Sequence, residues 1–449
     1  MGAEWRRVRL GEVVDINPDV IGPDWPYAHI RYVDISSVGE GVIVEPPKLI
    51  YLEEAPSRAK RLVREGDTVL STVRPGRRSM FFVSAPEPDL VVSTGFAVLR
   101  PKAGILDPRY LYACVFDKAF TDYLVSREKG AAYPAVLPED LADATVNLPP
   151  LPDQRAMAHI LGTLDDKIEL NRRMSETLEQ MARALFKAWF VDFEPVRAKM
   201  EGRWRRGESL PGLPAHLYDL FPDRLVPSEL GEIPEGWEVD TVGKHVRSVK
   251  GKSYKSEHLQ EGGDTALVTL KSFARGGGYR HDGLKSYSGA FEPEQVVRPG
   301  ELVIACTDVT QAAEVIGRPA LVQSSERYRT LVASLDVLIV RPRSEAVSVP
   351  FLYCLFRTEQ FAEHTYAHST GTTVLHLSKD AVPSYQFVRP PARVMQMFTS
   401  IAQGIFERID EAEGESRTLA ALRDALLPKL ISGELRVKDA EWFLKESGL

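Results

Sequence analysis

The chain of 449 residues has few cysteines, few histidines and no long apolar run. Its three cysteines, Cys114, Cys306 and Cys354, are far apart in apolar surroundings, so we expect neither a disulfide framework nor a zinc site, and we predict a cytoplasmic location. Because no stretch of about 18 apolar residues occurs, no membrane span is predicted, and the first residues lack the apolar core of a signal peptide. The formal net charge of −7 argues against a protein that coats nucleic acid over its whole surface, although it allows a local basic face.

Motifs for catalysis and cofactor binding are missing as well. Residues 251–253 read Gly-Lys-Ser, like the end of a phosphate-binding loop, but the first glycine of that motif would fall on Val246. The glycines at 276–278 lack the spacing of a dinucleotide-binding turn. Residues 147–150 resemble the Asn-Pro-Pro-aromatic motif of amino-methyltransferases only superficially, because a leucine intervenes and no aromatic residue follows. Since no His-Glu-x-x-His pair occurs either, the sequence predicts a non-catalytic protein without a metal ion or cofactor.

The sequence does contain a long coiled-coil stretch, from Asp153 to Phe193. Its apolar residues recur in alternating steps of four and three, which is the spacing of a coiled-coil seam. At 1.5 Å per residue, roughly 36 helical residues would span about 54 Å, so such a helix requires a partner along its length. The seam residues are Met157, Leu161, Leu164, Ile168, Leu178 and Leu185, with the polar Asn171 and Ser175 near the middle.

A second copy of the whole pattern begins near Trp237. Segments at 5–11, 64–70, 99–102 and 110–112 match segments at 237–243, 298–304, 340–343 and 351–353, which is a period of roughly 240 residues. This period is too long for a solenoid and indicates two half-proteins, each a globular domain followed by a long helix. The second helix is expected to end at Pro428, and its seam residues are Ile405, Ile409, Leu419 and Leu426.

The sequence therefore predicts an α+β fold, in which two mixed α/β domains are separated by an antiparallel two-helix coiled coil with a pseudo-twofold internal repeat. The helices would pair because each carries a stripe that neither can bury alone. Antiparallel pairing is favoured because the connector leaves the far end of the first helix and can feed a second domain there. The expected boundaries are a first domain at 1–150, a first long helix at 151–199, a connector with little helix at 200–236, a second domain at 237–390, a second long helix at 391–430 and a tail at 431–449.

Basic residues gather at equivalent places in the two halves. Seven Arg/Lys residues lie between Arg58 and Arg78 against two acids, and residues 72–79 are predicted to be a loop that presents three arginines. Guanidinium groups suit phosphates and the guanine edge by bidentate bonding. The equivalent loop of the second half, residues 307–313, has no arginine but carries polar side chains of the types that form hydrogen bonds with base edges. The candidate DNA contacts are Arg74, Arg77, Arg78, Lys129, Tyr133, Lys250, Lys252, Arg275, Tyr279, Arg280, Asp308, Thr310, Gln311 and Thr372, with a solvated charged face as the alternative.

Several segments resemble the specificity (S) subunit of type I restriction–modification systems. They are 148–155 (Leu-Pro-Pro-Leu-Pro-Asp-Gln-Arg), 164–173, 184–196 and 426–435, together with Gly236-Trp237 at the start of a second domain. The resemblance covers essentially the whole chain. It is weakest at the entry of the second helix, where residues 393–396 read Arg-Val-Met-Gln instead of the Pro-Asp-Gln-Arg of residues 152–155.

The resemblance implies that each globular domain is a target-recognition domain that reads one half of a split, asymmetric sequence in double-stranded DNA. It also implies that the helices form a spacer that sets the number of unread base pairs, that two methylation (M) subunits dock on them, and that restriction/motor (R) subunits join. The cofactor and nuclease sites would then belong to those partners. Two alternatives are a methyltransferase of the fused restriction type, which would need the motifs missing here, and a non-catalytic coiled-coil scaffold.

Overall fold

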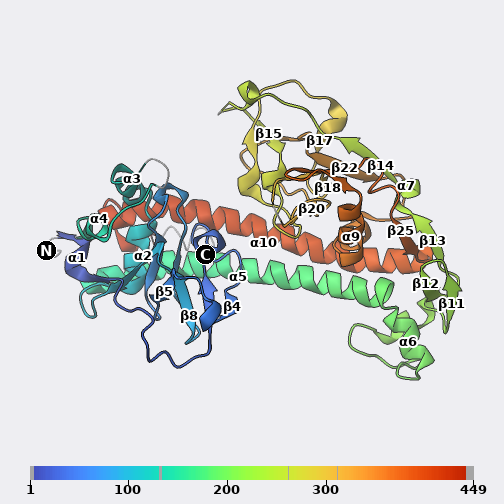
Figure 1. Ribbon diagram of the computed structural model, residues 1–449, viewed down its shortest axis with the longest axis horizontal. Helices are drawn as coiled ribbons and strands as arrows, with labels where there is room; N and C mark the ends of the chain where they lie inside the picture. The colour runs from blue at the N-terminus through green and yellow to red at the C-terminus, as the bar shows by residue number, and fades with distance from the viewer. Residues whose placement is uncertain (1–4, 131–133, 261, 311, 441–449) are drawn as a thin grey trace. The chain divides into compact units, whose positions relative to one another are not determined.

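The structure is a computed structural model that describes residues 5–130, 134–260, 262–310 and 312–440. The described residues fall into two compact units, unit 1 within Met1–Leu170 and Glu415–Leu449, and unit 2 within Asn171–Gly414. Each unit combines β-sheets with short helices (Figure 1). Each also contains part of the two long helices, α5 (Leu151–Phe186) and α10 (Ala392–Ser432).

Unit 1 is built on two four-stranded sheets. One is antiparallel with the order β2-β9-β6-β7, and the other has the order β4-β3-β8-β5 with β3 parallel to β8. Val33 and Val92 of the second sheet share a buried cluster with Val69 and Val98 of the first, so the two sheets pack on each other. The elements are β1 (Arg6–Arg9), α1 (Leu10–Val13), β2 (Val14–Ile16), β3 (His29–Val33), β4 (Lys48–Tyr51), β5 (Ala59–Leu62), β6 (Thr68–Ser71), β7 (Met80–Phe82), β8 (Leu90–Ser93), β9 (Phe96–Pro101), α2 (Pro108–Phe116), α3 (Lys118–Ser126), α4 (Pro138–Ala142) and β10 (Thr145–Leu148).

Unit 2 repeats this strand order. The sheet β14-β22-β18-β20 corresponds to β2-β9-β6-β7, the sheet β16-β15-β21-β17 corresponds to β4-β3-β8-β5, and β15 is again parallel to β21. The pair β13–β25 corresponds to β1–β10. The predicted internal repeat is therefore confirmed in the topology. The strands are β13 (Glu238–Thr241), β14 (Val246–Lys250), β15 (Thr265–Val268), β16 (Lys285–Ser286), β17 (Val296–Val297), β18 (Leu302–Ala305), β19 (Thr307–Asp308), β20 (Pro319–Leu321), β21 (Thr330–Ala333), β22 (Val337–Pro342), β23 (Ser369–Thr370), β24 (Leu375–Leu377) and β25 (Gln386–Arg389), and the short helices are α7 (Val242–His245), α8 (Val349–Phe356) and α9 (Glu359–Ala367).

The long helices α5 and α10 are in contact and antiparallel. In unit 1, Arg423 of α10 pairs with Asp165 of α5, with 2.8 Å between Nη1 and Oδ1. In unit 2, the ring centroids of Phe186 and Phe398 are 5.7 Å apart. Residues later in α5 thus contact residues earlier in α10, which is the antiparallel arrangement predicted from the sequence.

The apolar seam of the helices is buried most deeply near the globular cores. In unit 1 the seam leucines pack with Leu427 and Leu430 of α10 in one buried cluster. The polar middle of α5 is also buried, with Asn171 1% and Ser175 9% exposed. Among the predicted seam residues, Met157, Leu161, Leu164, Leu419 and Leu426 are buried, whereas Ile168, Leu178, Leu185, Ile405 and Ile409 are half-buried.

One expectation about a helix boundary is wrong. Helix α10 continues through Pro428 to Ser432, because the buried Leu426, Leu427 and Leu430 hold the last turns in place while Pro428 itself lies on the exposed side. Residues 108–126 form two helices, because the extended backbone of Asp117 (φ −61°, ψ 137°) ends α2 and begins α3.

The segment that follows α5 is packed rather than irregular. The segment begins with a turn of π-helix at Lys187–Val191, in which Trp189 and Phe190 are buried. The rings of Trp189 and Phe221 are 5.2 Å apart, and Trp204 is 1% exposed. The sequence predicted an irregular connector here because its prolines and glycines conceal these contacts. The elements are α6 (Glu194–Met200), a 3-10 turn at Ala215–Leu220, and the hairpin β11 (Leu225–Ser228) with β12 (Gly231–Pro234).

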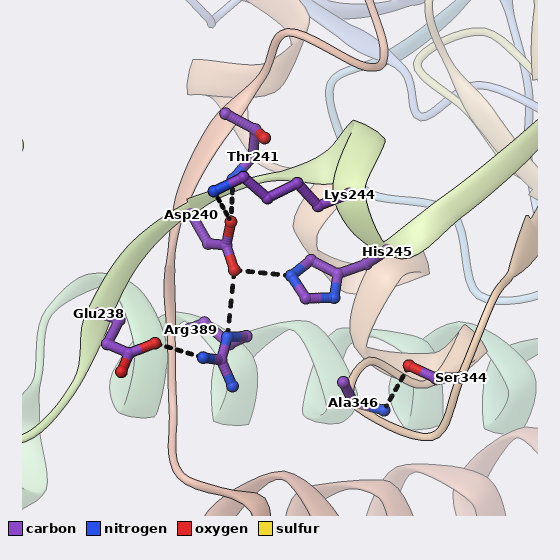
Figure 2. Close-up of polar contacts among 8 residues, drawn as sticks. All are labelled: Glu238, Asp240, Thr241, Lys244, His245, Ser344, Ala346 and Arg389. Carbon is purple, nitrogen blue, oxygen red and sulfur yellow. Dashed lines mark hydrogen bonds and ion pairs between the residues drawn. The ribbon is translucent and has the colours of Figure 1, made fainter.

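A polar network ties β13 to β25 (Figure 2). The carboxylate of Asp240 accepts hydrogen bonds from the Thr241 amide (2.8 Å) and from Arg389 Nε (3.2 Å), and it lies 2.9 Å from Lys244 Nζ and 2.7 Å from His245 Nε2. Burial raises the pKa of Asp240, but the hydrogen bonds from His245, Lys244 and Thr241 outweigh it and hold the pKa well below its ordinary value. Asp240 is therefore a charged anchor of the fold.

Candidate nucleic-acid interface

The predicted arginine loop of unit 1 connects β6 to β7 and has a constrained backbone. The backbones of Arg74 (φ 49°) and Arg78 (φ 54°) are both in the left-handed region, which residues other than glycine rarely adopt. Hydrogen bonds hold them there, from Arg74 N to Pro134 O (2.8 Å) and from Arg78 N to Pro75 O (2.9 Å). A strained turn fixed in this way presents its side chains in one arrangement.

The three arginines of this loop have different environments. Arg77 is exposed, and its guanidinium has no hydrogen-bond or ion-pair partner among the described residues. Arg74 is exposed as well. Arg78 is only 16% exposed and donates to Glu40 Oε1 (2.7 Å), Thr121 Oγ1 (2.8 Å) and the Phe116 carbonyl (2.6 Å). The prediction that Arg78 presents its guanidinium to DNA is therefore corrected: this cation holds the loop on α2 and α3.

The rest of the basic cluster is also partly used by the fold. Arg58 pairs with Asp34, and Arg64 lies 2.9 Å from Asp19. Lys60, Arg74 and Arg77 of this stretch are also exposed.

The loop around residue 129 lies beside the arginine loop. Ala135 forms β-bridges with both Val73 and Lys129, so the two predicted DNA-contacting loops of unit 1 are brought together. The Lys129 ammonium is exposed and lies 3.7 Å from Asp140. Tyr133 lies outside the described residues.

A hollow of about 570 Å³ opens beside this loop, between α3 and the end of α10. Its lining includes the carboxylates of Glu40, Asp117, Asp122 and Asp424 but only two cations. An excess of carboxylates opposes a phosphate, so the hollow does not extend the candidate DNA surface.

In unit 2 the loop after β18 is anchored by Asp308. This residue is 1% exposed, and its carboxylate accepts hydrogen bonds from the amides of Thr310 (2.6 Å), Val315 (2.6 Å) and Ile316 (2.9 Å). These hydrogen bonds lower the pKa of Asp308 although burial acts in the opposite direction. The prediction that Asp308 reads a base edge is corrected, because its oxygens are used to close the loop.

The side chains that this loop does expose are different. Thr310 is half-buried, and Gln311 lies outside the described residues. Val309 is 68% exposed, the highest value among the large apolar side chains described. Val309 is not among the candidates predicted from the sequence, although an apolar residue between two polar ones in a predicted loop is a usable signal. A valine held outward can contact a thymine methyl group in the major groove.

The glycine-rich loop of unit 2 packs against the Asp308 loop. Gly276 N donates to Glu314 O (2.9 Å), and Arg275 Nε lies 3.3 Å from Glu314 Oε2. Arg280 is exposed and pairs with Asp282, while Tyr279 is half-buried. Exposed ion pairs contribute little free energy, so Arg280 remains available to a stronger anion.

The last predicted contacts of unit 2 lie near the same edge. Strand β24 pairs with β19, which brings the exposed Thr372 of the β23–β24 turn beside the Asp308 loop. Lys250 is exposed at the end of β14, and Lys252 is half-buried and bridges to Ser334. The structure thus gathers these loops of unit 2 at one edge.

Other chemistry receives no support within the described part of the chain. Burial raises the pKa of the Cys114 and Cys306 thiols to about 12, so neither is a reactive thiolate at neutral pH. No group of three or more His, Cys, Asp or Glu side chains is arranged to hold a metal ion among the residues described. None of the helices described combines the length and apolar character that crossing a bilayer requires.

Comparisons with known proteins identify the family. Residues 2–180 match the family described as "Type I restriction modification DNA specificity domain". The type I restriction enzyme HindI specificity subunit of Haemophilus influenzae is 25% identical over 423 residues, which cover 86% of this chain and 90% of the relative. The chain belongs to the type I restriction–modification specificity subunits. The MjaIX specificity subunit of Methanocaldococcus jannaschii is 26% identical over 387 residues, 84% of this chain and 80% of that subunit.

The fold of this specificity subunit is also found in a solved structure. A crystal structure of the type I restriction–modification S subunit from M. genitalium matches with a TM-score of 0.50 and 14% identity, covering 95% of this chain and 96% of that one. Two β-rich domains joined by long antiparallel helices are thus the fold of both. Specificity subunits are the non-catalytic subunits of their systems, which agrees with the missing catalytic motifs.

Proposed function

We propose that this DNA-specificity subunit reads a bipartite, asymmetric site in double-stranded DNA, one half with each unit. The observation that carries the proposal is the repeated topology, in which loops at equivalent positions, residues 72–79 and 307–313, follow equivalent strands, β6 and β18. The two loops carry different side chains, exposed arginines in unit 1 and Val309 with Thr310 in unit 2. Equivalent loops with different chemistry would read different half-sites.

The helix pair α5–α10 would act as a spacer between the half-sites and as the docking region for two methylation subunits. A pair of helices packed along a seam is stiff and keeps a fixed length. Restriction/motor subunits would join the same complex. This arrangement leaves the chemistry to partners, in keeping with the catalytic motifs that the sequence lacks.

Selection of sequences from a randomised duplex library by the full chain, with its methylation partner, tests the proposal. The expected result is one enriched motif with two specified halves and an unspecified gap, bound with an affinity that falls steeply as salt increases. A single undivided motif would contradict the two-unit reading. Binding without salt dependence or sequence preference would favour the alternative of a coiled-coil scaffold.

A further inference from the structure

An arginine that follows α8 links the long helix to the glycine-rich loop of unit 2. The guanidinium of Arg357 lies 3.0 Å from Glu179 on α5 through Nη2 and donates from Nη1 to the carbonyl of Gly276 (2.9 Å). Tyr353 donates its hydroxyl hydrogen to the same Glu179 oxygen at 3.0 Å. The Arg357 side chain is 11% exposed, so these contacts are made largely out of water, where charged hydrogen bonds are strong.

The loop is shaped to receive this arginine. Gly277 has a φ of +105°, and a Cβ there would collide with Arg357 Nη1 and lie 3.1 Å from Pro319 O. Gly278 N donates to the same Pro319 carbonyl at 2.9 Å. Glycine is thus required here by both backbone conformation and close approach, and Arg357 closes the loop that carries Arg275 and Arg280.

The equivalent place in unit 1 makes a corresponding link by different chemistry. The matched segments 110–112 and 351–353 make Phe116, the last residue of α2, equivalent to Arg357.

The ring of Phe116 lies under two cations. Arg423 of α10 is 4.3 Å from the ring centroid, and Arg78 of the arginine loop is 5.0 Å from it. Arg423 in turn pairs with Asp165 of α5 at 2.8 Å. In both units, equivalent residues at the end of the first helix of a helix pair therefore link a carboxylate of α5 to a candidate recognition loop. Phe116 is the last residue of α2, and Arg357 directly follows α8.

We infer that Arg357 and Phe116 are positioning residues for DNA reading, which fix the recognition loop of each unit to the helix pair without touching DNA. The inference rests on the proposed function, because it assigns these loops to half-sites. It concerns the contacts within each unit. Glu179 orients Arg357, and Arg423 with Asp165 orients Phe116.

The test uses the full chain with two variants, Arg357→Lys and Glu179→Gln. Lysine keeps the charge but cannot bridge Glu179 and Gly276 with a planar fork. Two variants serve as matched controls. Arg341→Lys changes an arginine of β22 that bonds Glu301 and the Val296 carbonyl, and Glu176→Gln changes an exposed acid one turn before Glu179.

The first readout is hydrogen exchange of the Gly276 and Gly278 amides, which needs no DNA. Loss of the charged hydrogen bonds should speed their exchange about tenfold or more in both variants and not in the controls, with the thermal midpoint near that of the wild type. Unchanged exchange in both variants would overturn the inference, whatever the result with DNA.

The second readout is the motif selected from a randomised duplex library. In the Arg357→Lys variant, one half of the motif should lose specificity while the other half stays sharp. Faster exchange with both halves still sharp would overturn the positioning role. If the wild type selects no bipartite motif, the proposed function fails instead, and the exchange measurement still decides whether the link exists.

Discussion

At the scale of single residues, neighbouring arginines of one loop have opposite roles. Arg77 reaches solvent, whereas Arg78 is enclosed by Glu40, Thr121 and Phe116. Removing this cation would take a donor from the buried Thr121 hydroxyl and the buried Phe116 carbonyl, which water reaches poorly. The number of arginines in a basic loop therefore overstates the charge available to a ligand.

The first prediction compares these two arginines. Arg77→Ala should lose about 1–3 kcal/mol of DNA-binding free energy at one half-site and leave the thermal midpoint unchanged. Arg78→Ala should instead destabilise unit 1 by about 2–3 kcal/mol. Duplex titration and thermal unfolding of both variants separate the two effects, and an Arg78→Ala variant of wild-type stability would show that its contacts are not structural.

The second prediction concerns pH. Because the pKa of Asp240 is held below its ordinary value, its carboxylate stabilises the folded state above about pH 4, and this stabilisation is lost as the pH falls further. Replacing it by Asp240→Asn should lower the thermal midpoint at neutral pH, and the difference from the wild type should shrink below about pH 4. A difference that stays constant from neutral to acidic pH would rule out a role for the Asp240 charge.

At the scale of elements, the helix pair offers a direct test of the spacer role. Four residues inserted at facing positions in α5 and α10 would lengthen the pair by about 6 Å, or roughly two base pairs at 3.4 Å each. The gap in the selected motif should grow while both half-sites keep their sequences. A changed half-site would contradict the modular reading, and an insertion in α5 alone serves as the control because it breaks the seam.

Elements were also what the sequence predicted best. The heptad spacing and the duplicated segments are visible in the chain itself, and both the antiparallel helices and the repeated topology follow from them. The contacts that decide which loop residues are exposed are not local: Thr121 and Phe116 lie far along the chain from Arg78. Trp204 and Phe221 likewise belong to a segment whose prolines and glycines predicted no packing.

Electrostatic context explains the remaining misses. From its residue type alone, an aspartate in a predicted loop could either bind a base edge or accept hydrogen bonds that close the loop. The three backbone amides that donate to Asp308 show that its carboxylate closes the loop. Val309 is absent from the predicted candidates because these were chosen as polar and charged residue types, whereas a valine offers only apolar atoms. The sequence thus predicts where the candidate loops lie better than which atoms these loops expose.

At the scale of the whole molecule, the division into units has a consequence for biosynthesis. Unit 2 is one continuous stretch, whereas unit 1 needs Leu419, Leu426 and Leu430 from the C-terminal part of α10 to complete the core around Met157 and Leu161. A chain emerging from the ribosome makes unit 1 first but can finish its core only last.

A chain that stops after residue 414 should therefore leave the earlier-made unit open while the later-made one folds. Limited proteolysis of such a truncated chain should cleave residues 1–170 rapidly and spare residues 171–414. Equal resistance of both regions would show that unit 1 closes without α10. The half that is synthesised first is then the half whose folding waits for the end of translation.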